Sequence, residues 1–305
     1  MAKAVFTTKL SPSYDDVPEE RYHFPRTYLR VAESAVDDLI VYYEPRRSSA
    51  ALSSRGGRQA YFAVARVVDI QQDRRDPDQF YAIIAPQSYL SFDSPVPFRT
   101  QGGTYERILT REDGGTSKGA FGRSVRALKD DEFEAILAAG FVADQWEAPG
   151  QQPSGEGVAE APGVFVRPLV EQTSLRPFRD AAFRRAVRRA YDNRCAFTGL
   201  ALINGGGRPE VQAAHIRPVE HDGPDSIRNG LALSGTMHWL FDRGLITVAD
   251  DGAILTAKGA LPDQVLGLLN PDGRVRLPID TSETPHPMFL KHHREVIATG
   301  KAWIA

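Results

Sequence analysis

The sequence has 305 residues, of which 42% are hydrophobic and 25% charged, a composition typical of a globular chain with one large domain or two ordinary ones. Its formal net charge of -2 excludes a protein that is basic throughout, so any phosphate contact needs local positive charge. No window approaches the roughly 18 apolar residues of a membrane span, and residues 1–10 lack the apolar core of a signal peptide, so we expect a cytoplasmic protein without a membrane partner.

The first part of the chain carries short β-branched and aromatic runs separated by turn-rich stretches. The runs are Asp38–Tyr43, Tyr61–Ile70 and Phe80–Ala85. This spacing predicts a small β-barrel or a curled sheet. A helix is expected over Asp130–Ala139, because its acidic start suits the helix dipole and Gly140 ends it.

Residues 146–165 are rich in Pro, Gly, Glu and Gln and show no apolar periodicity. Such a composition predicts a flexible, semi-extended linker. We therefore divide the chain into an N-terminal domain over residues 1–145, the linker, and a C-terminal domain over residues 166–305.

A basic stretch follows the linker. Between Arg167 and Arg194 there are eight arginines and only three acidic residues. Apolar residues recur at helical spacing over Arg179–Asp192, which predicts a helix with one apolar face. The other face carries Arg184, Arg185, Arg188 and Arg189. It is either a solvated surface or a phosphate-binding face, and the motifs that follow favour the second interpretation.

A strand, a loop and a helix come next and would bring three polar side chains together. The strand Glu210–Ile216 ends near a histidine, a loop rich in Gly, Asp and Pro follows, and a helix is expected over Gly235–Phe241. The side chains that would converge are His215, Asn229 and His238. A neutral histidine can take a proton from water near pH 7, and a divalent metal can stabilise a leaving 3'-oxygen. This combination predicts hydrolysis of a phosphodiester.

Cys195 is the only cysteine, so neither a disulfide within the chain nor a cysteine-rich zinc site can form. A metal must then be held by nitrogen and oxygen ligands, which suits Mg²⁺ or Mn²⁺, with Zn²⁺ or Ni²⁺ as alternatives. His238 and Asp242 are four residues apart and share one face of the expected helix, so both could reach one ion. No nucleotide cofactor is expected.

Three motifs give the C-terminal region a family resemblance. They read Ala-Ala-His-Ile at 213–216, Asn-Gly-Leu-Ala-Leu at 229–233, and His-x-x-Phe-Asp-Arg-Gly at 238–244. In order and spacing they resemble the HNH endonuclease family, and Lys291–Glu295 resembles its closing element. The resemblance extends from about Arg179 to the C-terminus. It implies a ββα-metal core, a two-stranded hairpin packed on a helix around one metal ion.

The resemblance also implies roles for individual residues. His215 would be the general base, Asn229 would orient it or support the metal loop, and His238 would bind the metal. Asp242 would be a second ligand, unless it pairs with Arg243 or Arg217. Many relatives carry an Asp or His ligand where this chain has Ala214. Either the metal relies on His238, Asp242 and Gln212, or the site is weak. Arg217 is expected to contact phosphate together with the helix arginines. The other histidines of this region are expected to be loop or structural residues: His221, His286, His292 and His293.

The N-terminal strand runs resemble the PUA-like superfamily, which includes EVE, ASCH and SRA domains. This resemblance implies a curled barrel, and several members hold a modified base flipped out of the duplex, where stacking offsets the cost of extrusion. The expected pocket residues are Tyr22, Phe24 and Tyr43 for stacking, with Asp69 and Asp93 for the amino edge of cytosine. The alternative is that these aromatic residues form the core.

The sequence thus predicts an α+β protein with a PUA-like barrel and an HNH nuclease domain. The expected function is a metal-dependent restriction endonuclease that acts on double-stranded DNA carrying 5-methylcytosine or 5-hydroxymethylcytosine. A double-strand cut in one encounter needs two nuclease domains, so a homodimer is also expected. The alternatives are an HNH enzyme directed at unmodified DNA, a catalytically weak nucleic-acid-binding protein of the same fold, and a reader of RNA.

Overall fold

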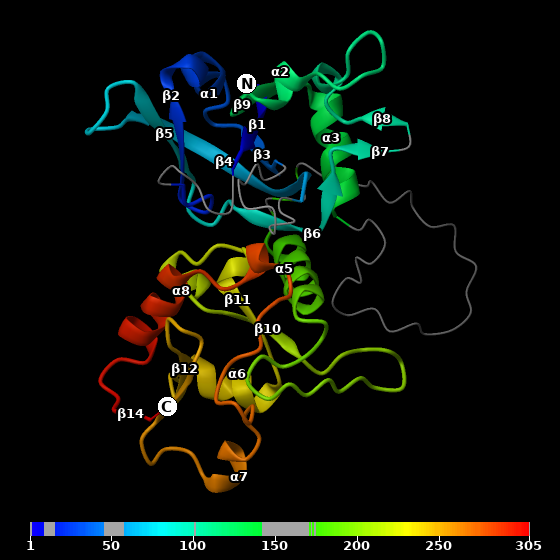
Figure 1. The fold of residues 1–305 in the computed structure, drawn as a ribbon. Helices are drawn as coiled ribbons and strands as arrows, with labels where there is room; N and C mark the ends of the chain where they lie inside the picture. Colours follow the sequence, from blue (N-terminus) through cyan, green and yellow to red (C-terminus); the bar gives the residue numbers. More distant parts are fainter. Residues whose placement is uncertain are drawn as a thin grey trace, which may run out of the picture.

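The computed structural model describes residues 2–8, 16–45, 58–100, 102–141, 171, 173 and 175–304. They form two lobes, one above the other in Figure 1, with the N-terminal lobe in blue to green and the C-terminal lobe in green to red. The predicted linker at 146–165 lies outside the described residues. Within the part of the chain that the structure describes, no helix is both long and apolar enough to cross a membrane.

A seven-stranded sheet forms the N-terminal lobe. Its strand order is β2-β5-β4-β3-β1-β9, with β6 paired to β4 beside this path. Only β1 and β3 pair in parallel; the other pairs in this sheet are antiparallel. The strands are β1 (Lys3–Thr7), β2 (Arg21–Pro25), β3 (Leu39–Glu44), β4 (Ala60–Gln72), β5 (Gln79–Ile84), β6 (Leu90–Pro97) and β9 (Val125–Leu128), with a separate small hairpin of β7 (Arg99–Thr100) and β8 (Gly103–Thr104).

The long strand β4 bends this sheet. Its first half pairs with β3 and β6, its second half pairs with β5, and the register shifts between Val67 and Asp69. Such irregularities kink a strand and increase its twist. The end strands β2 and β9 do not pair with each other among the described residues. The described strands therefore form a bent open sheet, and the closed barrel implied by the PUA-like resemblance is not formed.

Each face of the sheet carries its own core, because successive side chains of a strand point to opposite faces. Along β3, Ile40 and Tyr42 enter a cluster capped by α1 (Leu29–Ser34), whereas Val41 and Tyr43 enter a second cluster with α3 (Asp130–Gly140). The helix predicted over Asp130–Ala139 is confirmed to within one residue. A shorter helix, α2 (Lys118–Phe121), precedes β9.

The C-terminal lobe is built on the hairpin of β10 and β11 and on the helix α6. Strand β10 lies within the strand predicted over Glu210–Ile216, and α6 matches the helix predicted over Gly235–Phe241. A second small sheet has the order β12-β13-β14. The elements are α5 (Arg176–Ala190), β10 (Gln212–His215), β11 (Gly230–Leu233), α6 (Gly235–Asp242), β12 (Ile246–Val248), β13 (Ile254–Ala257), α7 (Asp263–Leu266), α8 (Pro287–His292), a π-helical turn (His293–Ile297) and β14 (Trp303–Ile304).

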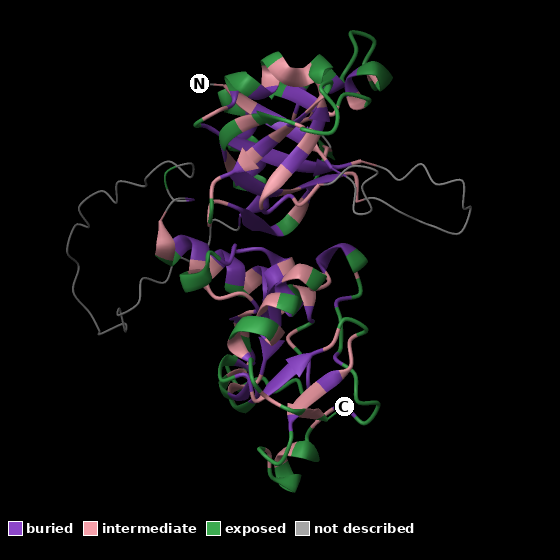
Figure 2. Cartoon of the chain, turned by 90° about the vertical axis from the view of Figure 1, so that its left-hand side faces the viewer, coloured by how far each residue is buried: buried purple, intermediate pink, exposed green. Residues whose placement is uncertain are grey.

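Helix α5 belongs to both lobes. Its first half places Phe178 and Ala182 in the core under β6, and its second half places Phe183 and Val187 in the core of the C-terminal lobe. Figure 1 shows α5 at the junction, directly below β6. Figure 2 shows buried residues continuing from the sheet through this junction into the lower lobe. The basic helix predicted from the sequence therefore joins the two lobes.

Candidate nuclease site

The hairpin β10–β11 sets the orientation of the first site residue. His215 ends β10 opposite Gly230, and its ring stacks on Phe183 of α5 with 3.9 Å between ring centroids. A Cβ atom at Gly230 would lie 2.5 Å from the Val187 side chain, so the hairpin approaches α5 this closely only because residue 230 is glycine. Ala214, on the opposite face of β10, is fully buried in the core. Position 214 therefore supplies no metal ligand, and its side chain faces the core instead of the His215 side of the strand.

A buried carboxylate holds the imidazole of His215. The Nε2 atom of His215 lies 3.0 Å from Oδ1 of Asp225, which has no exposed surface. Asp225 also accepts hydrogen bonds from Arg179 at 2.9 Å and Arg176 at 3.2 Å. Burial alone would raise the pKa of Asp225, but the hydrogen bond from His215 and the charges of both arginines outweigh it and lower that pKa.

This arrangement selects one tautomer of His215. The ionised Asp225 only accepts, so Nε2 carries the proton and Nδ1 carries a lone pair. Nδ1 has no hydrogen-bond partner within the described ranges, and the side chain keeps 18% of its surface exposed. The geometry therefore suits a group that takes a proton from a water molecule.

Asn229 clamps the loop between His215 and β11. Its Nδ2 atom donates to the carbonyl oxygens of Arg217 and Pro224, both at 3.0 Å, and its Oδ1 atom accepts from the Arg217 amide at 2.8 Å. The side chain is fully buried and satisfies three backbone groups of the loop. Among the described residues, Asn229 contacts the loop backbone and not the His215 ring, whose carboxylate neighbour is Asp225.

His238 lies on α6 in a more open setting. Its Nδ1 atom is 2.8 Å from Oε1 of Gln212, and its Nε2 atom is 3.5 Å from Oδ2 of Asp242. When Nδ1 donates to the Gln212 oxygen, the lone pair of Nε2 and the Asp242 carboxylate face the same space. A nitrogen and a carboxylate oxygen are ligands that divalent cations accept. This pair fits a metal, with Gln212 as the partner that orients the histidine.

No group of three or more His, Cys, Asp or Glu side chains that could hold a metal occurs among residues 2–304 that are described. A metal ion held by His238 and Asp242 would take most of its coordination from water or phosphate oxygens, as Mg²⁺ commonly does. Asp242 forms no ion pair with Arg217 or Arg243, the two partners considered above, both of which the structure describes. Arg217 pairs with Glu20, and Arg243 lies over the Trp239 ring.

The five arginines predicted to bind phosphate fall into two groups. Three form ion pairs with carboxylates: Arg185 with Asp93, Arg189 with Glu283, and Arg217 with Glu20. Arg184 is exposed, and Arg188 donates only to the Val211 carbonyl. Burial and the charges of Arg184 and Arg208 lower the pKa of Arg188. The positive charge left for phosphate thus gathers at Arg184, Arg188 and Arg208, the last of which the sequence interpretation missed.

The five residues predicted to form a modified-base pocket do not converge. Tyr22 and Phe24 lie in the core on one face of the sheet, whereas Tyr43 lies in the core on the other. Asp69 is exposed on β4, and Asp93 is buried under Arg185. The alternation of side chains along the strands is the physical reason, because it directs these aromatic residues into two separate cores.

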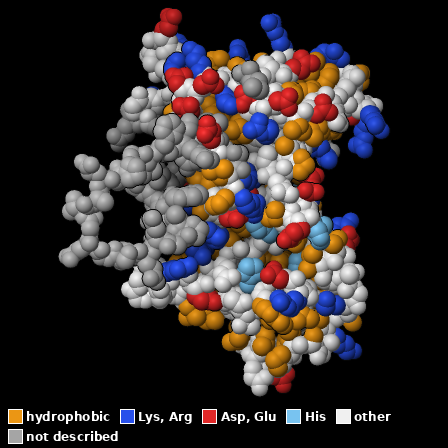
Figure 3. All heavy atoms as spheres, turned by 180° about the vertical axis from the view of Figure 1, so that it is seen from behind, with side chains coloured by type: hydrophobic (Ala, Val, Ile, Leu, Met, Phe, Trp, Pro, Cys, Tyr) orange, Lys and Arg blue, Asp and Glu red, His pale blue; other side chains and the backbone are white. Residues whose placement is uncertain are grey.

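Of the other histidines, four lie in the C-terminal lobe, and His23 lies on β2 of the N-terminal lobe. His293 is buried between the Phe241 carbonyl and the Thr247 hydroxyl, and its ring stacks on Phe241. His221 and His292 contact each other, with Nδ1 and Nε2 3.1 Å apart. In the space-filling view of Figure 3, histidine side chains gather at the waist between the lobes.

The site is attached directly to the N-terminal lobe. Arg179 donates to the carbonyl oxygens of Ser88 and Tyr89 at 3.1 and 2.7 Å, as well as to Asp225. The amide of Ser91 donates to the Asp225 carbonyl at 3.1 Å. Sequence reasoning missed Asp225 and Arg179 as site residues, although both lie in segments it singled out, the Gly/Asp/Pro loop and the basic stretch.

Comparisons with known proteins place this geometry in context. Residues 195–249 match the HNH endonuclease family, and the match contains all three motifs. No curated protein matches the chain. Seven chains of solved structures match, and two of them are restriction endonucleases with low TM-scores. One is the modification-dependent TagI restriction endonuclease, with a TM-score of 0.31, 16% identity, and coverage of 95% of this chain and 80% of that one.

The other solved structure is the type IV phosphorothioation-dependent restriction endonuclease ScoMcrA. Its TM-score is 0.20 at 13% identity, and the alignment covers 77% of this chain and 52% of that one. The chain thus spans about half of the length of ScoMcrA. Neither score is high enough to define the fold.

Proposed function

We propose that this protein is a metal-dependent DNA endonuclease of restriction type, in which His215 is the general base. The observation that carries the proposal is the pair of His215 with the buried Asp225, which leaves Nδ1 of His215 able to accept a proton. The HNH family match over residues 195–249 supports the same chemistry.

Each residue of the candidate site has its own role in this proposal. Nδ1 of His215 takes the proton of the attacking water, and Asp225 stays ionised and stabilises the imidazolium that forms. Asn229 holds the loop on which Asp225 lies. His238 and Asp242 would hold a divalent cation, with Gln212 fixing the His238 ring. When bound, that cation supplies charge stabilisation at the scissile phosphate and the leaving oxygen. Arg184, Arg188 and Arg208 would contact neighbouring phosphates.

The substrate side of the proposal is double-stranded DNA that carries 5-methylcytosine or 5-hydroxymethylcytosine, sensed by the N-terminal domain. What supports it is the pairing of a nuclease site with a separate sheet lobe that is attached to the His215 site through Arg179 and Ser91. A homodimer belongs to the same proposal, because a double-strand cut in one encounter requires two nuclease sites.

The test is cleavage of matched plasmids, unmodified or carrying either modified cytosine, with Mg²⁺ or Mn²⁺. Wild type is compared with His215→Ala, for which loss of the general base predicts a rate lower by about 10²–10⁴-fold. His221→Ala is the matched control, since it removes a histidine outside this site and should cleave like wild type.

Each outcome decides between the alternatives. Cleavage limited to modified plasmids and lost in His215→Ala supports both halves of the proposal. Equal cleavage of all plasmids keeps the nuclease and overturns the modification sensor. Binding without cleavage under every metal condition overturns the nuclease and favours a nucleic-acid-binding protein of the same fold, and tighter binding of RNA than of DNA would identify a reader of RNA.

A further inference from the structure

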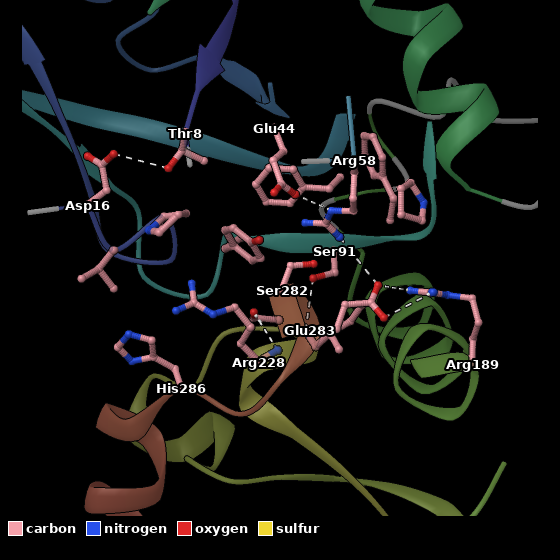
Figure 4. Close-up of a pocket in the computed structure, with 18 residues that line it drawn as sticks. Thr8, Asp16, Glu44, Arg58, Ser91, Arg189, Arg228, Ser282, Glu283 and His286 are labelled. Atoms are coloured by element: carbon pink, nitrogen blue, oxygen red, sulfur yellow. Dashed lines mark hydrogen bonds and ion pairs between the residues drawn. The ribbon is translucent and has the colours of Figure 1, made fainter. Parts of the chain in front are cut away.

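A cavity of about 340 Å³ lies between the two lobes (Figure 4). Phe62 and Tyr89 line it from the N-terminal lobe, and residues 226–228 and His286 line it from the C-terminal lobe. Its volume lies in the range of roughly 300–1,000 Å³ that small-molecule sites occupy. The nuclease chemistry described above does not use this cavity.

Each guanidinium group that lines the cavity is compensated within the protein. The three guanidinium groups each pair with a carboxylate: Arg58 with Glu44 at 2.7 Å, Arg189 with Glu283 at 2.6 Å, and Arg228 with Glu19 at 3.4 Å. None of these cations is therefore left to bind a phosphate group. The cavity suits an uncharged occupant.

One buried oxygen of the wall lacks a partner. Glu44 is only 2% exposed, and its Oε2 atom accepts from Arg58, whereas its Oε1 atom has no hydrogen-bond partner in the described part of the chain. A carboxylate oxygen only accepts, and a buried polar atom without a partner is unfavourable. An occupant that brings an N–H group to Glu44 would remove this defect.

The rest of the lining suits a flat ring. Tyr89 offers an aromatic surface, and the flat Arg58 guanidinium lies over the Phe62 ring, 4.7 Å from its centroid. His286 accepts a hydrogen bond from the Met288 amide at Nδ1, so in its neutral form Nε2 carries a proton that it can donate. Burial and the charge of Arg228 lower the pKa of His286, which favours that neutral form. The wall thus combines flat surfaces, an acceptor and a donor.

We propose that this cavity binds a nucleobase with an exocyclic amino group, as in cytosine or adenine, whose N–H group bonds to Glu44. The inference rests on the proposed function only for the source of the base, which is either a nucleotide of the DNA substrate or a free nucleoside.

The position of the cavity links it to the nuclease site. Residues 226–228 lie between Asp225 and Asn229, and the Ser91 hydroxyl accepts from the Ile227 amide. A bound base therefore contacts the loop that positions His215.

The experiment is calorimetric titration of the full chain, without metal, against two pairs of nucleosides. Cytidine and uridine differ in an amino or a carbonyl group, as do adenosine and inosine. We expect the amino member of one pair to bind at least about ten times more tightly, which corresponds to about 1.4 kcal/mol. Glu44→Gln offers an N–H group in place of an acceptor, so it should abolish or reverse that preference. Glu20→Gln, which removes a carboxylate outside the cavity, should retain it.

Two further measurements identify where the bound base comes from and provide a substitute variant if Glu44→Gln misfolds. Cytosine-containing duplexes that compete with free cytidine place the base in DNA, and duplexes that do not compete identify a free nucleoside as the ligand. If Glu44→Gln fails to fold, Phe62→Ala takes its place and should weaken both members of a pair alike by removing the ring on which the Arg58 guanidinium lies. Equal binding of amino and carbonyl members, or no binding of nucleosides and duplexes, overturns the inference. Because the experiment measures binding, its result tests the inference about the cavity independently of whether the protein cleaves DNA.

Discussion

The two histidines of the candidate nuclease site are held in different ways. His215 is fixed by Asp225, which is itself buried and bonded to two arginines and to the N-terminal lobe. His238 contacts Gln212 and Asp242 on an open surface, and the Asp242 side chain is 53% exposed. One histidine therefore depends on the packing of the two lobes, whereas the other depends on its immediate neighbours.

Because the two histidines are held differently, substitutions near each should affect folding stability and DNA cleavage to different degrees. Changes around His215 should disturb both folding and cleavage, because the same carboxylate supports the interface and the imidazole. Changes around His238 should disturb metal binding alone. The predictions below test that separation, beginning with the largest expected effect.

Replacing Asp225 by alanine should have the largest effect. It leaves the guanidinium of Arg179, only 7% exposed, without its carboxylate partner. Removing one member of a buried pair costs about 3–5 kcal/mol, so urea unfolding should show a loss of that size in the free energy of unfolding. Cleavage should fall as well, since the His215 tautomer is no longer selected.

Asp222→Asn is the control for this variant, because the backbone at Asp222 has a φ of 59°, which Asn adopts more readily than Ala. Asp222 belongs to the same loop but is exposed, and its carboxylate accepts a hydrogen bond from the Gln87 side chain. It should leave both the free energy of unfolding and cleavage close to wild type. Normal stability of Asp225→Ala would show that the interface does not depend on this carboxylate, and the contrast between the two histidines would fail.

The next effect concerns His293, which packs behind the helix that carries His238. Burial lowers the pKa of His293 to about 4, compared with about 6.5 in an unfolded chain. As the pH falls from 6.5 to 4, the unfolded chain binds a proton that the folded chain does not. The contribution is thus fully present above pH 6.5, and about 3 kcal/mol of the free energy of unfolding should be lost by pH 4.

Denaturant titrations of wild type and His293→Gln across this pH range isolate that contribution, since the other titrating groups cancel in the difference. The variant should show a shallower loss of stability towards low pH. Parallel curves for the two proteins would mean that His293 already binds a proton in the folded state.

Much of the nuclease site could be predicted because its residues are close in sequence. The strand ending at His215, the loop and the helix of His238 all fall within one continuous segment, and their periodicities are distinct. Local pattern also predicted β3, β4, β5 and α3 to within a few residues. In each case the signal lies within a single element.

Contacts between segments that are distant in the chain could not be predicted from the sequence. Asp225 acquires its role from Arg179, 46 residues away, and from Ser91 in the other lobe. Nothing in the loop sequence distinguishes its carboxylate from that of Asp222. The aromatic residues expected to line a modified-base pocket, Tyr22, Phe24 and Tyr43, do not converge for a related reason. Strand alternation places Tyr42 and Tyr43 on opposite faces, but sequence alone does not say that both faces are covered.

A smaller effect is expected at Gln212, which orients the ring of His238. Loss of such an outer partner lowers metal affinity by about 10–100-fold. Titration of cleavage against Mn²⁺ should therefore need that much more metal for Gln212→Ala, while its free energy of unfolding stays unchanged because the residue is exposed. The control is Gln72→Ala, an exposed glutamine of the N-terminal lobe. A loss of stability in Gln212→Ala would contradict the assignment of this site as locally held.

The smallest effect separates two adjacent arginines of α5. Arg184 is exposed and has no partner within the described ranges, whereas Arg185 pairs with the buried Asp93. Each phosphate contact releases about one counterion, so Arg184→Ala should reduce the slope of log affinity against log salt by about 1 and leave stability unchanged. Arg30→Ala removes another exposed charge, in the N-terminal lobe, and should leave the slope as it is. If both variants change the slope equally, α5 attracts DNA only through net charge. A change for Arg184 alone places the DNA backbone along this face of α5, beside His215.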